Sequence, residues 1–60
     1  MTHEHFIEAL EDELRRRHVQ FLYTEIRSFV ELHWPAIVKD PDIGRWAREF
    51  IDSGQGTVSV

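Results

Sequence analysis

Residues 2–33 contain neither glycine nor proline, and this uninterrupted stretch constrains the fold more than any other feature of the sequence. Its apolar residues recur at intervals of three and four, the spacing that places side chains on one side of an α-helix. Thr2 is a suitable N-cap residue, and Glu4 is favourable near the positive end of the helix dipole. The pattern predicts one long helix over about residues 3–34, with a length of about 45 Å.

The segment HWPAIVKDPD, residues 33–42, is predicted to interrupt this helix. Pro35 has no backbone N–H to donate, and it disfavours helical geometry at Trp34. Proline is also well suited to the first turn of a helix. We therefore expect a break at Pro35, followed by a short helical turn over residues 35–39.

A second helix is predicted over about residues 41–53. Asp40 is a suitable N-cap residue, and Gly54 is placed to end the helix. One apolar face follows the helical period and consists of Ile43, Trp46, Ala47, Phe50 and Ile51. Residues 54–60 are expected to form a flexible tail, because the alternating sequence TVSV has no strand with which to pair.

The chain has 60 residues and no cysteine, which excludes disulfides and thiolate zinc sites. Domains this short bury little surface and often depend on a second subunit. The large apolar side chains are more numerous than we expect a monomer of two or three helices to hide. We therefore predict a single all-α domain over residues 1–60, a helical hairpin of one long and one shorter helix with a proline break, which pairs in a homodimeric bundle.

The apolar residues of the long helix fall on two overlapping faces when each residue advances by about 100°. One face contains Phe6, Ile7, Leu10, Leu14 and Phe21. The other lies about a quarter-turn further round and contains Val19, Leu22, Tyr23, Ile26, Val30 and Ile37. We interpret one face as packing on the chain's own second helix and the other as binding a second subunit or a target. The alternative is one irregular core around a single helix.

Aromatic residues and their neighbours are the candidate binding residues, because tyrosine and tryptophan are over-represented as interface anchors. The predicted partner-binding residues are Tyr23, Arg27, Phe29, Val30 and Trp34. Arg27 and Glu31 are expected to set the orientation of the partner. The predicted dimer or core residues are Leu10, Leu14, Phe21, Leu22, Ile26, Trp46, Phe50 and Ile51. We expect Trp46 to lie inside and Trp34 to be the more exposed tryptophan.

The segment EDELRRRHVQ, residues 11–20, holds three consecutive arginines. Four residues separate Glu11 from Arg15, Asp12 from Arg16, and Glu13 from Arg17. Acid and base at this spacing stabilise a helix by about 0.2–0.5 kcal/mol per pair. We interpret the run as reinforcement of the helix, with contact between one or two arginines and a partner as the alternative.

No catalytic or cofactor motif is visible, so we assign no catalytic residue, no metal ligand and no cofactor, and expect the protein not to be an enzyme. His3 and His5 form a pair near the N-terminus, but a zinc site needs three or four converging ligands. His18 and His33 lie near the apolar stripes and are interpreted as packed or interfacial residues.

The formal net charge of −4 disfavours general binding to DNA or RNA, since neutralisation of phosphates dominates that affinity. The N-terminal sequence MTHEHFIEAL lacks the features of a signal peptide, and no apolar stretch is long enough to cross a bilayer. We therefore expect a location in the cytoplasm of a bacterium or of a phage-infected bacterial cell.

The segments EHFIEALEDELRRRHVQFLYTEIRSFVELHW and DPDIGRWAREFI cover most of the chain. In their size, acidity and helical character they resemble small phage proteins that disable host regulators, such as the quorum-sensing anti-activator type. Members of that type are small helical dimers that bind a LuxR-type receptor and can also contact the pilus-assembly ATPase. The resemblance is one of architecture and includes no shared motif, so it assigns no functional residue.

Together these features predict a non-enzymatic protein–protein interaction module, a small inhibitor or anti-activator that sequesters a regulatory protein of the host cell. One alternative is an acidic helical-hairpin dimer that binds RNA, in which Arg15, Arg16, Arg17 and Arg27 would supply a basic strip. Another is an antitoxin-like structural dimer.

Overall fold

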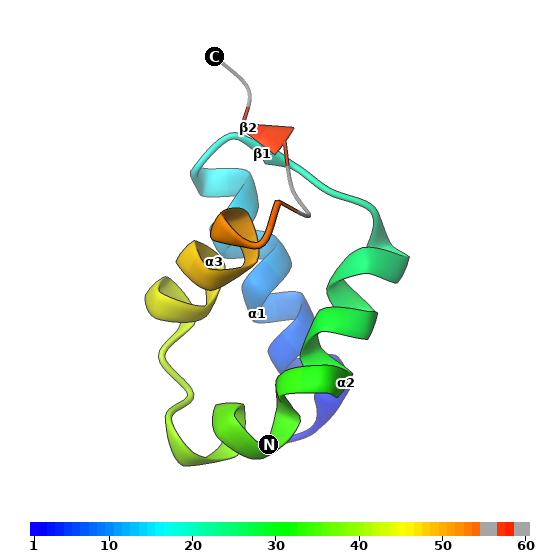
Figure 1. The fold of residues 1–60 in the computed structure, drawn as a ribbon, viewed down its shortest axis with the longest axis vertical. Coiled ribbons are helices and arrows are strands. Elements are labelled where there is room, and N and C mark those ends of the chain that lie inside the picture. Colours follow the sequence, from blue (N-terminus) through cyan, green and yellow to red (C-terminus); the bar gives the residue numbers. More distant parts are fainter. Residues whose placement is uncertain (55–56, 59–60) are drawn as a thin grey trace.

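The computed structural model describes residues 1–54 and 57–58, which are mostly helical. In chain order the elements are α1 (His3–Arg16), β1 (Val19–Gln20), α2 (Tyr23–Lys39), α3 (Ile43–Asp52) and β2 (Thr57–Val58). α1 packs against both α2 and α3 (Figure 1). The helical character of the chain is confirmed, but the described residues form three helices where a hairpin of two was predicted. In this part of the chain, none of the helices combines the length and apolarity required to span a bilayer.

The predicted long helix over residues 3–34 is wrong, because the chain turns between α1 and α2. The backbone N–H of Arg17 donates to the carbonyl of Glu13 at 3.1 Å, and that of His18 donates to the carbonyl of Arg15 at 3.0 Å. His18 then adopts a φ of 59°, in the left-handed region. Histidine is one of the few non-glycine residues enriched in that region. The helix can therefore end here without glycine or proline.

The start of α2 also lacks an ordinary sequence signal. Its N-cap is Leu22, with φ −100° and ψ 141°, and a leucine side chain cannot accept a hydrogen bond. Glu25 supplies half of a capping box, because its Oε1 accepts a hydrogen bond from the backbone N–H of Leu22 at 3.2 Å. This carboxylate thus helps to fix the first turn of α2.

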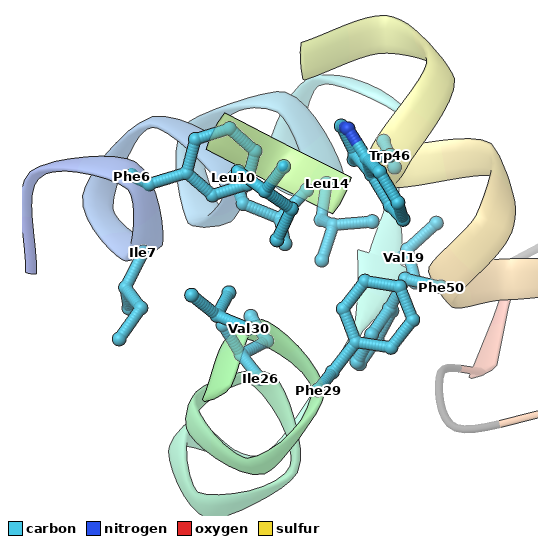
Figure 2. Packing of buried hydrophobic residues seen from close by; sticks show 12 residues of the cluster. Phe6, Ile7, Leu10, Leu14, Val19, Ile26, Phe29, Val30, Trp46 and Phe50 are labelled. Carbon is cyan, nitrogen blue, oxygen red and sulfur yellow. The ribbon is translucent and has the colours of Figure 1, made fainter. Parts of the chain in front are cut away.

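The turn makes a compact molecule possible. A continuous helix over residues 3–34 would be about 45 Å long, whereas the longest dimension of the molecule is 32 Å. With the chain reversed at His18, the apolar faces of α1 and α2 oppose each other (Figure 2).

The core collects apolar side chains from the three described helices and from β1 (Figure 2). Its buried members are Phe6, Ile7, Leu10, Leu14, Val19, Ile26, Phe29, Val30, Ile37, Trp46, Ala47 and Phe50. Phe21, Trp34, Ile43 and Ile51 are partly buried against them. One chain therefore hides most of its large apolar residues, and the expectation that a monomer could not do so is wrong. A homodimer cannot be inferred from a surplus of apolar side chains.

Leu22 is the exception among the predicted dimer or core residues. Its side chain is 64% exposed, and the residue is the N-cap of α2, outside the first helical turn. Leu10, Leu14, Ile26, Trp46 and Phe50 are buried as expected, and Phe21 and Ile51 lie at the edge of the core.

Pro35 does not break the chain, so the predicted separate turn over residues 35–39 is wrong. α2 continues through Pro35 and ends at Lys39. Pro35 is exposed, and the Glu31 carbonyl that loses its helical donor lies one turn back on an exposed part of the helix, where water can hydrate it. The proline therefore removes one hydrogen bond without interrupting the buried face.

α3 starts two residues later than predicted, and its N-cap is Asp42. Asp42 Oδ1 accepts hydrogen bonds from the backbone N–H groups of Gly44 at 3.0 Å and Arg45 at 3.3 Å. Asp40, the predicted N-cap, instead ends α2, and its carboxylate pairs with Arg45. Gly54 follows the helix with a φ of 80°, as expected for a terminating glycine.

β2 corrects the prediction that residues 54–60 form a flexible tail without a pairing partner. Residues 57–58 pair antiparallel with β1, in the register Val19↔Val58 and Gln20↔Thr57. The partner strand exists because the predicted long helix is interrupted at that point. The expectation for residues 55–56 and 59–60 falls outside the described residues.

The left-handed turn can be tested at His18, whose side chain is exposed. We expect His18→Gly to have a free energy of unfolding about 1 kcal/mol higher than His18→Ala, because glycine adopts positive φ without steric cost. Urea denaturation of the two variants measures this difference. In a continuous helix the order would reverse, since alanine is favoured over glycine inside a helix by about 1 kcal/mol.

Candidate interaction surface

The large apolar residues exposed to solvent gather on one element. Among the described residues they are Met1, Leu22, Tyr23, Leu32 and Val38. Four of these five belong to α2 or to its N-cap. In Figure 1, α2 forms one border of the molecule, with α1 and α3 on its other side. α2 and its N-cap therefore carry most of the exposed large apolar residues of the described chain.

Five residues of this helix form a strip along its outer side. At about 100° per residue, Tyr23, Arg27, Glu31, Trp34 and Val38 fall within a sector of about 80°. We call these five residues the α2 strip. The sector lies directly beside the buried face formed by Ile26, Phe29, Val30 and Ile37. The strip is thus the part of the helix surface that borders the buried face on one side.

An ion pair occupies the middle of the α2 strip. Arg27 Nε lies 3.3 Å from Glu31 Oε1, and the side chains are 61% and 53% exposed. Tyr23, 50% exposed, lies toward the N-terminal end, and Val38, 54% exposed, lies toward the C-terminal end. The strip therefore has apolar ends, a polar centre and no net charge.

Trp34 is held in place by α1. Its ring meets the imidazole of His3 edge to face, with centroids 4.1 Å apart, and the ring of Phe6 at 6.4 Å. Trp34 is partly buried, whereas Trp46 is only 6% exposed and donates through Nε1 to the Asp40 carbonyl at 2.6 Å. The predicted order of exposure is confirmed. Trp34 is consequently a fixed aromatic group at the surface.

The structure brings together three of the five predicted partner-binding residues, Tyr23, Arg27 and Trp34. Phe29 and Val30 are 2% and 0% exposed, so the prediction that they belong to a binding surface is wrong. Both point into the core (Figure 2), where the Phe29 ring meets the rings of Trp46 and Phe50 from α3 at centroid distances of 6.1 and 5.3 Å.

Sequence reasoning missed Val38, because residues 35–39 were assigned to a separate turn. Its spacing of four from Trp34 could have placed it on the strip. Leu32 is also highly exposed, at 73%, but lies about 100° further round the helix than Glu31. Leu32 therefore provides a matched apolar position outside the α2 strip.

The arginine run is paired with acids of the same helix, though mostly at other spacings than predicted. Arg17 Nε lies 2.8 Å from Glu13 Oε2, which confirms that pair. Arg15 instead pairs with Asp12 at 3.1 Å, and Arg16 lies 3.9 Å from Glu13. Both other pairs thus have a spacing of three. The C-terminal turn of α1 is therefore a mixed-charge surface and not a basic one.

Arg17 also connects two helices. While Nε contacts Glu13, Nη2 donates to the carbonyl of Gly44 in α3 at 3.2 Å. The guanidinium can hold both acceptors because its N–H groups form a rigid planar fork. This contact joins the end of α1 to the first turn of α3.

We expect Arg17→Gln to lower the free energy of unfolding by about 1 kcal/mol, because it removes an ion pair and an interhelical hydrogen bond at a partly exposed site. Arg16→Gln is the control, since the Arg16 side chain is 72% exposed, and its effect should be within about 0.5 kcal/mol. Urea denaturation monitored by tryptophan fluorescence measures both. Equal effects would contradict a connecting role for Arg17.

The histidines have separate surroundings. His33 is partly buried, with its ring 4.4 Å from that of Phe29 and 5.6 Å from that of Trp46. His18, interpreted from the sequence as a packed or interfacial residue, is exposed in the turn and is not packed in the core. Among the described residues, no three histidine, aspartate or glutamate side chains form a group that could hold a metal ion.

Comparison of the chain with protein-family models, with curated proteins and with solved structures finds no match. Its described residues form a small, mostly helical fold in which α2 presents the α2 strip to solvent. The strip combines aromatic, aliphatic and paired charged side chains.

Proposed function

We propose that the chain is a non-enzymatic protein–protein interaction module that uses the α2 strip to bind and sequester a regulatory protein of a bacterial host cell. The observation that most directly supports this proposal is that Tyr23, Arg27 and Trp34 lie in one sector of α2 that borders its buried face. Tyrosine, tryptophan and arginine are the residue types most enriched among binding hot spots. The inhibitory role and the host setting rest on the architectural resemblance to phage anti-activators.

The residue types of the α2 strip indicate what kind of binding site the partner should have. A helix face of this kind docks in an apolar groove, with anchors spaced along one side of the helix. Tyr23 and Trp34 would fill the groove, while Arg27 and Glu31 would meet opposite charges at its edge and set the register. Sequestration follows if the groove is the surface that the regulator needs for its own activity.

RNA binding receives less support. Each of the four arginines assigned to it, Arg15, Arg16, Arg17 and Arg27, has a carboxylate oxygen within 3.9 Å. Phosphate binding would require those acids to be displaced or to stay beside the phosphates, and either reduces the electrostatic gain.

We expect Tyr23→Ala to weaken partner binding about 30-fold, the equivalent of about 2 kcal/mol for the loss of a hot-spot side chain. The matched control is Leu32→Ala, which removes an exposed apolar side chain from the same helix outside the strip. Immobilised wild-type, Tyr23→Ala and Leu32→Ala chains are incubated with bacterial lysate, with and without nuclease, and the captured proteins are compared by quantitative mass spectrometry.

A protein retained by wild type and Leu32→Ala, lost with Tyr23→Ala and insensitive to nuclease supports the proposal. Loss of all captured material after nuclease treatment would favour the alternative that the chain binds RNA. If Leu32→Ala abolished capture and Tyr23→Ala did not, the α2 strip would be the wrong surface. Circular dichroism of both variants establishes that the helices are intact.

A further inference from the structure

We infer that the α2 strip is self-complementary, so that two copies of the chain associate through α2 in antiparallel order. The homodimer covers the surface that the monomer presents to a protein partner. Self-association follows from the positions of the strip residues alone, whereas its effect on partner binding rests on the proposed function.

The positions of the two charges define the register. In an antiparallel pair with its two-fold axis level with residue 29, residue 27 of one copy lies opposite residue 31 of the other. Arg27 and Glu31 lie about 3 Å on either side of that level along the helix, at about 1.5 Å per residue. Arg27 of each copy therefore meets Glu31 of the other, and the two ion pairs become a ring of four alternating charges.

The same two-fold axis also brings the aromatic residues of the two copies opposite each other. Tyr23 falls opposite residue 35 of the second copy, only one residue, or about 1.5 Å, from Trp34. Tyr23 of each copy can thus pack on the Trp34 ring that His3 and Phe6 hold in place. Both the charged and the aromatic contacts occur twice, as an isologous interface requires.

Charge complementarity favours this orientation over the parallel one. In a parallel pair in register, Arg27 would face Arg27 and Glu31 would face Glu31, and like charges in contact oppose association. The chain as a whole carries −4, but the α2 strip itself is neutral. Five of the eleven acidic residues, Glu4, Glu8, Glu11, Asp12 and Glu13, belong to α1 and not to the strip.

The size of the strip indicates how strong such a dimer is. A stable interface of standard size covers about 800 Å² on each partner, which is about a fifth of the 4135 Å² exposed by this chain. One sector of a 17-residue helix offers less than that. The dimer is therefore weak and dissociates on dilution, which allows the strip to exchange between self-association and a tighter protein partner.

Sedimentation velocity on the purified full chain, from micromolar to millimolar concentration, tests the dimer. Wild type is expected to shift from monomer toward dimer across this range. Arg27→Glu and Glu31→Arg alone each place like charges opposite one another, and each should weaken self-association about tenfold or more.

An equimolar mixture of the two variants should associate again as a heterodimer. One copy then carries two carboxylates at positions 27 and 31, the other carries two guanidinium groups there, and each carboxylate faces a guanidinium. The control is Arg48→Glu, which makes the same charge change at an exposed residue of α3 and should dimerise like wild type. It would dimerise like Arg27→Glu only if net charge alone decided association.

A wild-type chain that remains monomeric at millimolar concentration would overturn the inference. So would a mixture of the two charge variants that stays monomeric while wild type dimerises, or an Arg48→Glu variant that loses the dimer to the same extent as Arg27→Glu. These measurements contain no host protein, so a negative result leaves the proposed partner binding to the capture experiment. Conversely, a dimer without any captured partner would sustain this inference and count against the proposed function.

Discussion

The left-handed turn at His18 is the constraint on which the rest of the structure depends. α1 has 14 residues, α2 has 17 and α3 has 10, and helices of such length are marginal in isolation. Their stability comes from packing apolar faces together, and α1 and α2 can do so only if the chain reverses between them. The same turn places the extended residues of β1 where β2 can reach them.

α2 contributes to the core and, in the proposed function, also carries the binding surface. Ile26, Phe29, Val30 and Ile37 face the core, and the α2 strip begins directly beside them. Because Trp34 contacts both α1 and solvent, the position of the strip is coupled to the packing of the two helices. A binding surface built on a packed helix requires little ordering on association, which reduces the entropic cost of binding.

Helical periodicity was sufficient to predict the helical content and most of the core, because burial follows the same three- and four-residue spacing inside a short helix as inside a long one. It could not locate the turn, because a histidine at positive φ follows the end of α1 and a leucine is the N-cap of α2. Neither residue is the glycine or serine that usually marks such positions. Pro35 led to the opposite error, the prediction of a break inside α2, because an exposed proline inside a helix has little effect on the buried face of that helix. Tyr23, Arg27 and Trp34 could be proposed from residue type, but separating them from Phe29 and Val30 required knowing where α1 lies.

The pairing of β1 with β2 has a consequence for the order of folding. The contacts between α1 and α2 join neighbouring segments, whereas Val19 and Val58 are about 40 positions apart in the chain, and closing a loop of that length carries a larger entropic cost. We therefore expect the helical hairpin of α1 and α2 to assemble first and the strand pair to close last. The connection between α1 and α2, which contains β1, is thus fixed only at the end of folding, when β2 from the C-terminal part of the chain pairs with it.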